Sequence, residues 1–125
     1  MLAVTSNPSS SFLQEERIGD KYLFERVIEL AHKCNDNKNI GLVVGATKPH
    51  LWGKVIERAV DLPLLIPGIG AQGGDNVQLK QSLKDYPAPV LINVALSIIY
   101  ASSGSDFQEV ASKEAEKIFL SLKDD

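Results

Sequence analysis

Short apolar runs alternate with longer segments of helical periodicity along this chain of 125 residues. Four of the runs predict β-strands, and they cover residues 1–6, 39–47, 62–70 and 88–96. The second run, "NIGLVVGAT", is apolar without alternation, which is typical of strands that are covered on both faces. We therefore expect these strands to be buried on both sides.

A segment of helical periodicity follows each run. Asp20 is the expected N-cap of the first helix, and Pro49 precedes the second. Asp75 begins the third, while Ser105 and Gln108 have the spacing of a capping box at the fourth. The apolar faces predicted for the four helices are, in order, Leu23, Val27, Leu30 and Ala31; Leu51, Val55 and Ala59; Val77, Leu79 and Leu83; and Phe107, Val110, Ala111, Ile118 and Leu122.

The order βαβαβαβα indicates an α/β fold, with a parallel sheet and right-handed crossovers. Four such units can form an open, flavodoxin-like sheet, or they can be half of a (β/α)₈ TIM barrel, whose usual length is about 250 residues. Both architectures bind ligands at the carboxyl ends of the strands. The turns to inspect are therefore "TSNPSSS", "GATKPH", "PGIGAQGGD" and "NVALSIIYASSG".

Composition narrows the classes of function. The net charge of -3 provides no broad basic field for nucleic acid, and no apolar run approaches the roughly 20 residues that span a bilayer. Cys34, the single cysteine, cannot form an internal disulfide, and the first residues lack the pattern of a signal peptide. We expect a single-domain cytoplasmic protein with no nucleic-acid or membrane partner.

The turn "PGIGAQGGD" is the strongest candidate for ligand binding. Its glycines permit positive φ and close backbone approach, and the helix that follows presents free N–H groups, which suits an anion such as a phosphate. Gln72 can both donate and accept hydrogen bonds. Alternatively, the glycines only shape a tight turn and Asp75 only caps the helix, since glycine patterns alone are weak signals.

Four stretches together carry a family resemblance. "TSNP" at 5–8, "GLVVGAT" at 41–47, "LPLLIPGIGAQGGD" at 62–75 and "VLINVALSIIYAS" at 90–102 resemble the second half of orotidine 5'-monophosphate decarboxylase. The resemblance implies that the four strands correspond to strands five to eight of a (β/α)₈ barrel. Residues 1–125 would then be a single C-terminal (β/α)₄ half-barrel of a cofactor-independent lyase of pyrimidine biosynthesis.

The resemblance also assigns contacts to orotidine or uridine 5'-monophosphate. It implies that Ser6 hydrogen-bonds the pyrimidine edge, whereas from the residue alone Ser6 is a turn hydroxyl at a strand end. It implies that Gln72 bridges the pyrimidine and the 5'-phosphate. The remaining phosphate contacts would come from Gly73 and Gly74 in a mobile loop and from the backbone amides near Ala95 and Leu96.

Two features depart from the family pattern. The resemblance implies that Leu96 stands where the family has a phosphate-binding arginine, a loss that should weaken phosphate affinity about ten- to a hundredfold or more. The family's catalytic Lys-x-Asp-x-Lys-x-x-Asp network has no match; Lys48 lies in the wrong unit, and the acidic residues of "LQEERIGD" indicate a solvated helix start. We therefore expect no catalytic residue and no decarboxylase activity from this chain alone.

A half-barrel would expose unpaired strand edges and the apolar interior of the barrel. A homodimer could cover them, as one closed barrel or as two flavodoxin-like sheets, and so could a missing N-terminal half-barrel. The alternative function is a catalytically silent half-barrel, natural or engineered, with a role in assembly. His32 and His50 have no partner spacing for a metal site, and Cys34 is expected to be partly buried.

Overall fold

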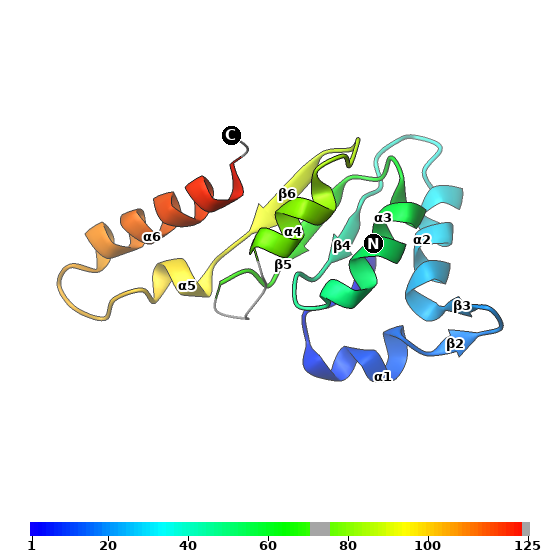
Figure 1. The fold of residues 1–125 in the computed structure, drawn as a ribbon, viewed down its shortest axis with the longest axis horizontal. Helices are drawn as coiled ribbons and strands as arrows, with labels where there is room; N and C mark the ends of the chain where they lie inside the picture. The colour runs from blue at the N-terminus through cyan, green and yellow to red at the C-terminus, as the bar shows by residue number, and fades with distance from the viewer. Residues whose placement is uncertain (71–75, 124–125) are drawn as a thin grey trace.

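A sheet of four parallel strands forms the centre of the computed structural model, which describes residues 1–70 and 76–123 (Figure 1). The strands lie in the order β1 (Leu2–Val4), β4 (Leu42–Val44), β5 (Leu64–Pro67) and β6 (Val90–Asn93). All three pairings are parallel. Each predicted strand is present but shorter than its apolar run, and the α/β fold with a parallel sheet is confirmed.

The four predicted helices follow the strands in the expected order. They are α2 (Leu23–Lys33), α3 (Trp52–Ala59), α4 (Asn76–Leu83) and α6 (Phe107–Leu122). The periodicity did not predict several shorter elements, because each spans only two to four residues. These are η1 (Pro8–Ser10), α1 (Ser11–Gln14), the hairpin of β2 (Arg17–Ile18) and β3 (Lys21–Tyr22), η2 (Pro49–Leu51) and α5 (Leu96–Ile99).

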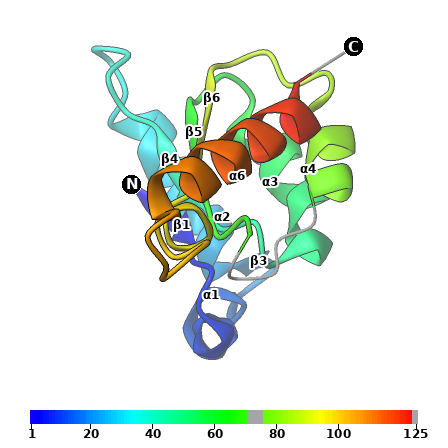
Figure 2. The same ribbon diagram turned by 90° about the vertical axis from the view of Figure 1, so that its left-hand side faces the viewer.

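The hydrophobic core lies on one face of the sheet, which we call the helix-covered face. Figure 2 shows α3 and α4 on the same side of strands β4 to β6. Alternate residues of β4 and β5 point into this layer and are almost fully buried, as are the apolar helix residues that meet them. The principal members are Val4, Leu42, Val44, Leu64 and Ile66 from the strands and Phe24, Ile28, Ala31, Val55 and Ala59 from the helices.

The opposite face of the sheet, which we call the open face, is exposed in the described part of the chain. Leu65 pairs in register with Val43 and with Leu91, so the three side chains form a row across the sheet. The exposed fractions are 41% for Leu65 and 67% for Leu91, and Leu2 on β1 is 55% exposed. The expectation that both faces are covered is therefore wrong for the described residues.

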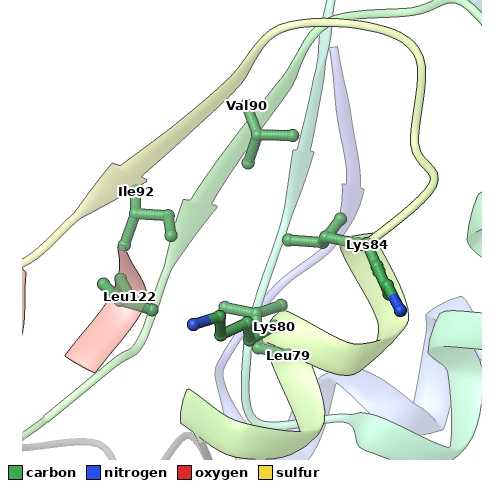
Figure 3. Close-up of a pocket in the computed structure, with 7 residues that line it drawn as sticks. Leu79, Lys80, Lys84, Val90, Ile92 and Leu122 are labelled. Atoms are coloured by element: carbon green, nitrogen blue, oxygen red, sulfur yellow. The ribbon is translucent and has the colours of Figure 1, made fainter. Parts of the chain in front are cut away.

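Helix α6 packs less closely than the other three long helices. Figure 1 shows it beyond β6, joined to the sheet through α5. Ile118 is buried, whereas Phe107, on the predicted apolar face, is 52% exposed. Two cavities, of about 290 and 450 Å³, lie between α6 and its neighbours. Figure 3 shows the smaller one, lined by Leu79, Lys80 and Leu83 of α4, Lys84 directly after α4, Val90 and Ile92 of β6 and Leu122 of α6.

The start of α2 differs from the prediction. Its N-cap is Tyr22 rather than Asp20, and the backbone N–H of Tyr22 donates to Oε2 of Glu25 over 2.8 Å. Asp20 lies instead in the turn of the β2–β3 hairpin, so the helix begins later than expected. The buried face of α2 also differs from the predicted one, since Leu30 is 48% exposed while Phe24 and Ile28 are buried.

Three further local predictions are wrong. The N-cap of α6 is Asp106 rather than Ser105, and its carboxylate accepts a hydrogen bond from the Ser102 hydroxyl over 2.6 Å. On α4, Val77 is 75% exposed, so of the three predicted apolar positions only Leu79 and Leu83 face inward. Cys34, which follows the last turn of α2, is exposed rather than partly buried.

Candidate functional site

The turns that follow the four parallel strands lie together at one end of the sheet, because parallel strands have all their carboxyl ends on the same side. We call this end, where the strands finish, the carboxyl edge of the sheet. In Figure 1 this is the lower edge, where α1, the start of α3 and α5 lie. The turn after β4 lies between its neighbours: the Gly45 N–H donates to the Val4 carbonyl over 2.7 Å, and the Ala46 N–H donates to the Pro67 carbonyl over 2.8 Å.

Ser6 is fixed by direct contact with the turn after β4. A Cβ atom at Gly45 would lie 2.5 Å from the backbone nitrogen of Ser6, so the close approach of the two chains requires glycine. The Thr47 hydroxyl donates to the Ser6 carbonyl over 2.9 Å. The backbone of Ser6 is thus held at the sheet edge, and its side chain is half-buried.

Residues 5–16, which we call the β1 loop, also close on themselves. The Thr5 N–H donates to Oε1 of Gln14 over 2.9 Å, and the Ser10 hydroxyl donates to the Thr5 carbonyl over 3.4 Å. At the tip of the loop, Phe12 and Leu13 are 85% and 60% exposed. The loop therefore has a polar, hydrogen-bonded base and an apolar tip.

A charged cluster joins the β1 loop to the turn after β4. We call it the Lys48 cluster, and it consists of Ser11, Glu15, Lys48 and His50. The Lys48 ammonium donates to the Ser11 hydroxyl and, over 3.2 Å, to Oε1 of Glu15. Nε2 of His50 lies 3.0 Å from Oε2 of Glu15. Lys48 is only 8% exposed, so this lysine is buried with its charge compensated.

The environment of Glu15 favours its ionised form. Hydrogen bonds from Ser11 and then from His50 are the main causes, and together with Lys48 they lower the pKa of Glu15 to about 2, against the effect of burial. The prediction that the acidic residues of this stretch are simply solvated is therefore wrong for Glu15. In the sequence, the i,i+4 spacing of Ser11 and Glu15 could have indicated that these two side chains meet, but no local signal brings Lys48 to them.

The turn after β5 has the backbone conformation that its glycines predict. Gly68 and Gly70 have φ values of 99° and 79°, a region that side-chain-bearing residues rarely adopt. A Cβ atom at Gly70 would lie 2.5 Å from the hydroxyl oxygen of Ser97, so this turn lies directly against α5. Gln72, Gly73 and Gly74, the predicted phosphate loop, lie outside the described residues, as does Asp75.

Ala95 and Leu96 lie at the start of α5. Ala95 is the N-cap, and its carbonyl accepts the N–H groups of Ile98 and Ile99, each over 3.0 Å. The side chain of Leu96 is 51% exposed. In a helix, the first backbone N–H groups have no acceptor within the helix. The backbone amide of Leu96, which is predicted to contact the phosphate, therefore lies at the start of a helix. The leucine side chain of the same residue is an exposed apolar group.

The sheet separates the two predicted halves of the site. Ser6 follows the edge strand β1 and Leu96 follows the opposite edge strand β6, with β4 and β5 between them.

Residues 1–70 and 76–123 contain no group of three histidine, cysteine or acidic side chains that could bind a metal ion. Within the same ranges, no helix is both long enough and apolar enough to cross a membrane.

The fold is that of an α/β protein with a parallel sheet. The turns that follow the carboxyl ends of its strands form the candidate site. Residues 1–120 match the family model of the Orotidine 5'-phosphate decarboxylase / HUMPS family, and the chain belongs to that family.

Curated relatives and solved structures agree with this assignment. Orotidine 5'-phosphate decarboxylase of Delftia acidovorans is 43% identical over 129 residues, covering 99% of this chain and 47% of the relative. The Variovorax paradoxus protein of the same name is 48% identical over 120 residues, covering 92% and 44%. The structure of Leishmania donovani OMP decarboxylase matches with a TM-score of 0.70 and 38% identity over 97% of this chain and 46% of that one. The chain thus spans a little under half the length of the curated relatives it matches.

Proposed function

We propose that residues 1–125 form a single C-terminal (β/α)₄ half-barrel of an orotidine 5'-monophosphate decarboxylase, and that this half-barrel binds a pyrimidine nucleotide monophosphate. The observation that carries the proposal is the open face of the sheet. Parallel sheets are normally covered on both faces, yet Leu65 and Leu91 expose a row of apolar side chains. In a closed barrel the same row would point into the packed interior.

The partner that we propose for this face is an N-terminal half-barrel. The match with the solved OMP decarboxylase covers 97% of this chain but only 46% of the decarboxylase. The remaining 54% of the decarboxylase therefore lies outside the match. The strands here thus have an arrangement compatible with a complete barrel. A second copy of this chain is the other candidate, because two open faces could cover each other in a homodimer.

The nucleotide site that we propose uses the edge where the strands end. Ser6 would contact the pyrimidine, and its fixed backbone supports that role. Gly68 and Gly70 shape the turn that leads to the phosphate loop, and Gly70 lies beside the start of α5. The proposed contacts are Ser6, Gln72, Gly73, Gly74 and the backbone amides near Ala95 and Leu96.

We also propose that the chain alone does not decarboxylate its ligand. In the family, a lysine and its carboxylate partners supply the proton, and the sequence has no match for that pattern. Lys48 does not replace it, because its ammonium is engaged by Ser11 and Glu15. We further propose a cytoplasmic location. Cys34 is a free and exposed thiol, which is compatible with a reducing compartment.

Titration of the purified chain with uridine 5'-monophosphate tests the site. Leu96→Arg restores a guanidinium at the phosphate end, so we expect affinity to rise about tenfold or more. The matched control is Leu120→Arg on α6, which changes the charge equally at a leucine that is 60% exposed, and it should leave affinity unchanged. An equal gain in both variants would indicate nonspecific charge attraction and would contradict the site.

A decarboxylation assay tests the proposed inactivity. Orotidine 5'-monophosphate incubated with the purified chain should decay at the background rate, and turnover above it would refute the proposal. The alternative function is a silent half-barrel with a role in assembly, favoured by the exposed apolar side chain of Leu96 at the phosphate end. Absence of nucleotide binding by both the wild type and Leu96→Arg would support that alternative.

A further inference from the structure

Two consecutive residues of the turn after β4, Thr47 and Lys48, form hydrogen bonds with different parts of the β1 loop. The Thr47 hydroxyl donates to the carbonyl of Ser6, where the loop begins. The Lys48 ammonium donates to Ser11, beside the tip of the loop, and to Glu15, near the end of the loop. Since Thr47 and Lys48 follow a buried strand, their positions are set by the sheet, and the loop takes its position from them.

The contact through Lys48 is shielded more than an ordinary surface ion pair. The side chain of Lys48 is 10% exposed and that of Glu15 is 23% exposed, and both oxygens of the Glu15 carboxylate have a cationic or potentially cationic neighbour. Exposed pairs contribute little because water screens them, whereas loss of one partner from a buried pair leaves an uncompensated charge. The depressed pKa of Glu15 agrees with a carboxylate that stays ionised.

We propose that Lys48 is a positioning residue for the pyrimidine end of the nucleotide site. It holds the second half of the β1 loop, from Ser11 to Glu15, against the same turn whose Thr47 holds the backbone of Ser6, so that the whole loop keeps Ser6 at the carboxyl ends of the strands. This inference rests on the proposed function, because it takes Ser6 as the pyrimidine contact. Lys48 itself does not contact the ligand in this proposal, since its ammonium is already bonded to Ser11 and Glu15.

The proposal predicts an asymmetry between the two ends of the ligand. The β1 loop lies at the β1 edge of the sheet, while the turns proposed for phosphate follow β5 and β6. Loss of the Lys48 contact should therefore weaken recognition of the pyrimidine and leave recognition of the phosphate intact. A residue that merely stabilised the fold would affect both ends equally.

Amide hydrogen exchange on the purified chain tests the first step without any ligand. Lys48→Met keeps the aliphatic stem and removes the charge, and we expect exchange of the amides in residues 5–16 to accelerate about tenfold, with α3 and β5 unchanged. Lys117→Met is the control, because Lys117 is 77% exposed and pairs with Glu114 within α6. Unchanged exchange in the β1 loop of Lys48→Met would overturn the proposal.

A pair of ligands tests the second step. In Lys48→Met, the affinity for uridine 5'-monophosphate should fall about three- to tenfold, the usual effect of one lost hydrogen bond, while the affinity for ribose 5-phosphate should not change. An equal fall for both ligands, or no fall for either, would overturn the positioning role. If the wild type binds neither ligand, the proposed function fails, and hydrogen exchange still decides whether Lys48 holds the loop.

Glu15→Gln provides a second, milder variant in case Lys48→Met does not fold. It removes the carboxylate charge with little change of shape and should reproduce the faster exchange of the β1 loop. If Lys48 acts through Glu15, the double variant should exchange no faster than Lys48→Met alone, because both substitutions break the same contact. Additive acceleration in the double variant would show that the two residues act separately and would contradict the proposal.

Discussion

The two faces of the same four-stranded sheet differ sharply in how they are packed. On the helix-covered face, where α3 and α4 lie (Figure 2), Leu64 and Ile66 are almost fully buried. On the open face, their neighbours Leu65 and Leu91 are 41% and 67% exposed. Both faces are apolar in sequence, so hydrophobicity of the strand alone does not tell which face has a partner within the chain.

This difference indicates what the chain can stabilise by itself. Burial of apolar area is the main favourable contribution to folding, at about 25 cal/mol per Å². The helix-covered face already provides that burial, whereas the open face provides it only when another surface is placed on it. The stability of the chain should therefore depend on one face, and its assembly on the other.

Paired substitutions of adjacent strand residues have the largest expected effect. Leu64→Ala should lower the free energy of unfolding by about 2–5 kcal/mol, because it leaves a cavity in the core. Leu65→Ala removes the same atoms from an exposed position and should cost less than about 1 kcal/mol in the isolated chain. Urea denaturation at low protein concentration measures both. Equal losses would mean that the open face is covered in solution.

Glu25 tests how the helix layer is held together, and its expected effect is smaller. This carboxylate is 4% exposed, accepts the Tyr22 N–H and pairs with Nε of Arg58 over 3.3 Å. Glu25→Ala removes both contacts and should lower the free energy of unfolding by about 1–3 kcal/mol. Glu29→Ala, on the same helix but more exposed, is the control and should cost clearly less. A similar loss in both variants would contradict a special role for Glu25.

Acid titration extends the comparison to the edge where the strands end. The pKa of Glu15 is lowered to about 2 in the folded chain, chiefly by Ser11 and His50, so its stabilising effect is present above the unfolded value near 4.5 and is lost as the pH falls toward 2. Because the side chain retains contact with water, we expect a contribution of about 1–2 kcal/mol.

Denaturation of the wild type and Glu15→Gln at pH 6 and at pH 3 measures this contribution. The two proteins should differ by the full amount at pH 6 and by less at pH 3. A difference that does not depend on pH would show that Glu15 acts through packing rather than through its charge.

Much of the fold could be predicted from local patterns in the sequence. Continuous apolar runs located all four parallel strands, and the 3.6-residue period located α2, α3, α4 and α6. Local patterns did not predict the open face, because a strand buried by helices on one face and by another polypeptide on the other has the same apolar sequence as a strand covered within its own chain. An exposed apolar face was expected only from the resemblance to half of a barrel.

The candidate site was only partly predictable. The absence of a side chain on glycine allows the close approach of Gly45 to Ser6 and the positive φ of Gly68. The glycines in the sequence therefore indicated where the turns lie. The contact of Lys48 with Glu15 joins residues 33 positions apart, beyond the reach of any local pattern. The contact depends on the register of β1 against β4, which only the folded chain provides.

The exposed thiol of Cys34 offers a practical route to the assembly question. It follows the carboxyl end of α2, a helix that crosses back along the helix-covered face, so it lies toward the amino ends of the strands, away from the candidate site. It is also the single cysteine of the chain. A fluorophore attached there would report, by energy transfer or anisotropy, when a second polypeptide covers the open face, and it would do so without occupying that face.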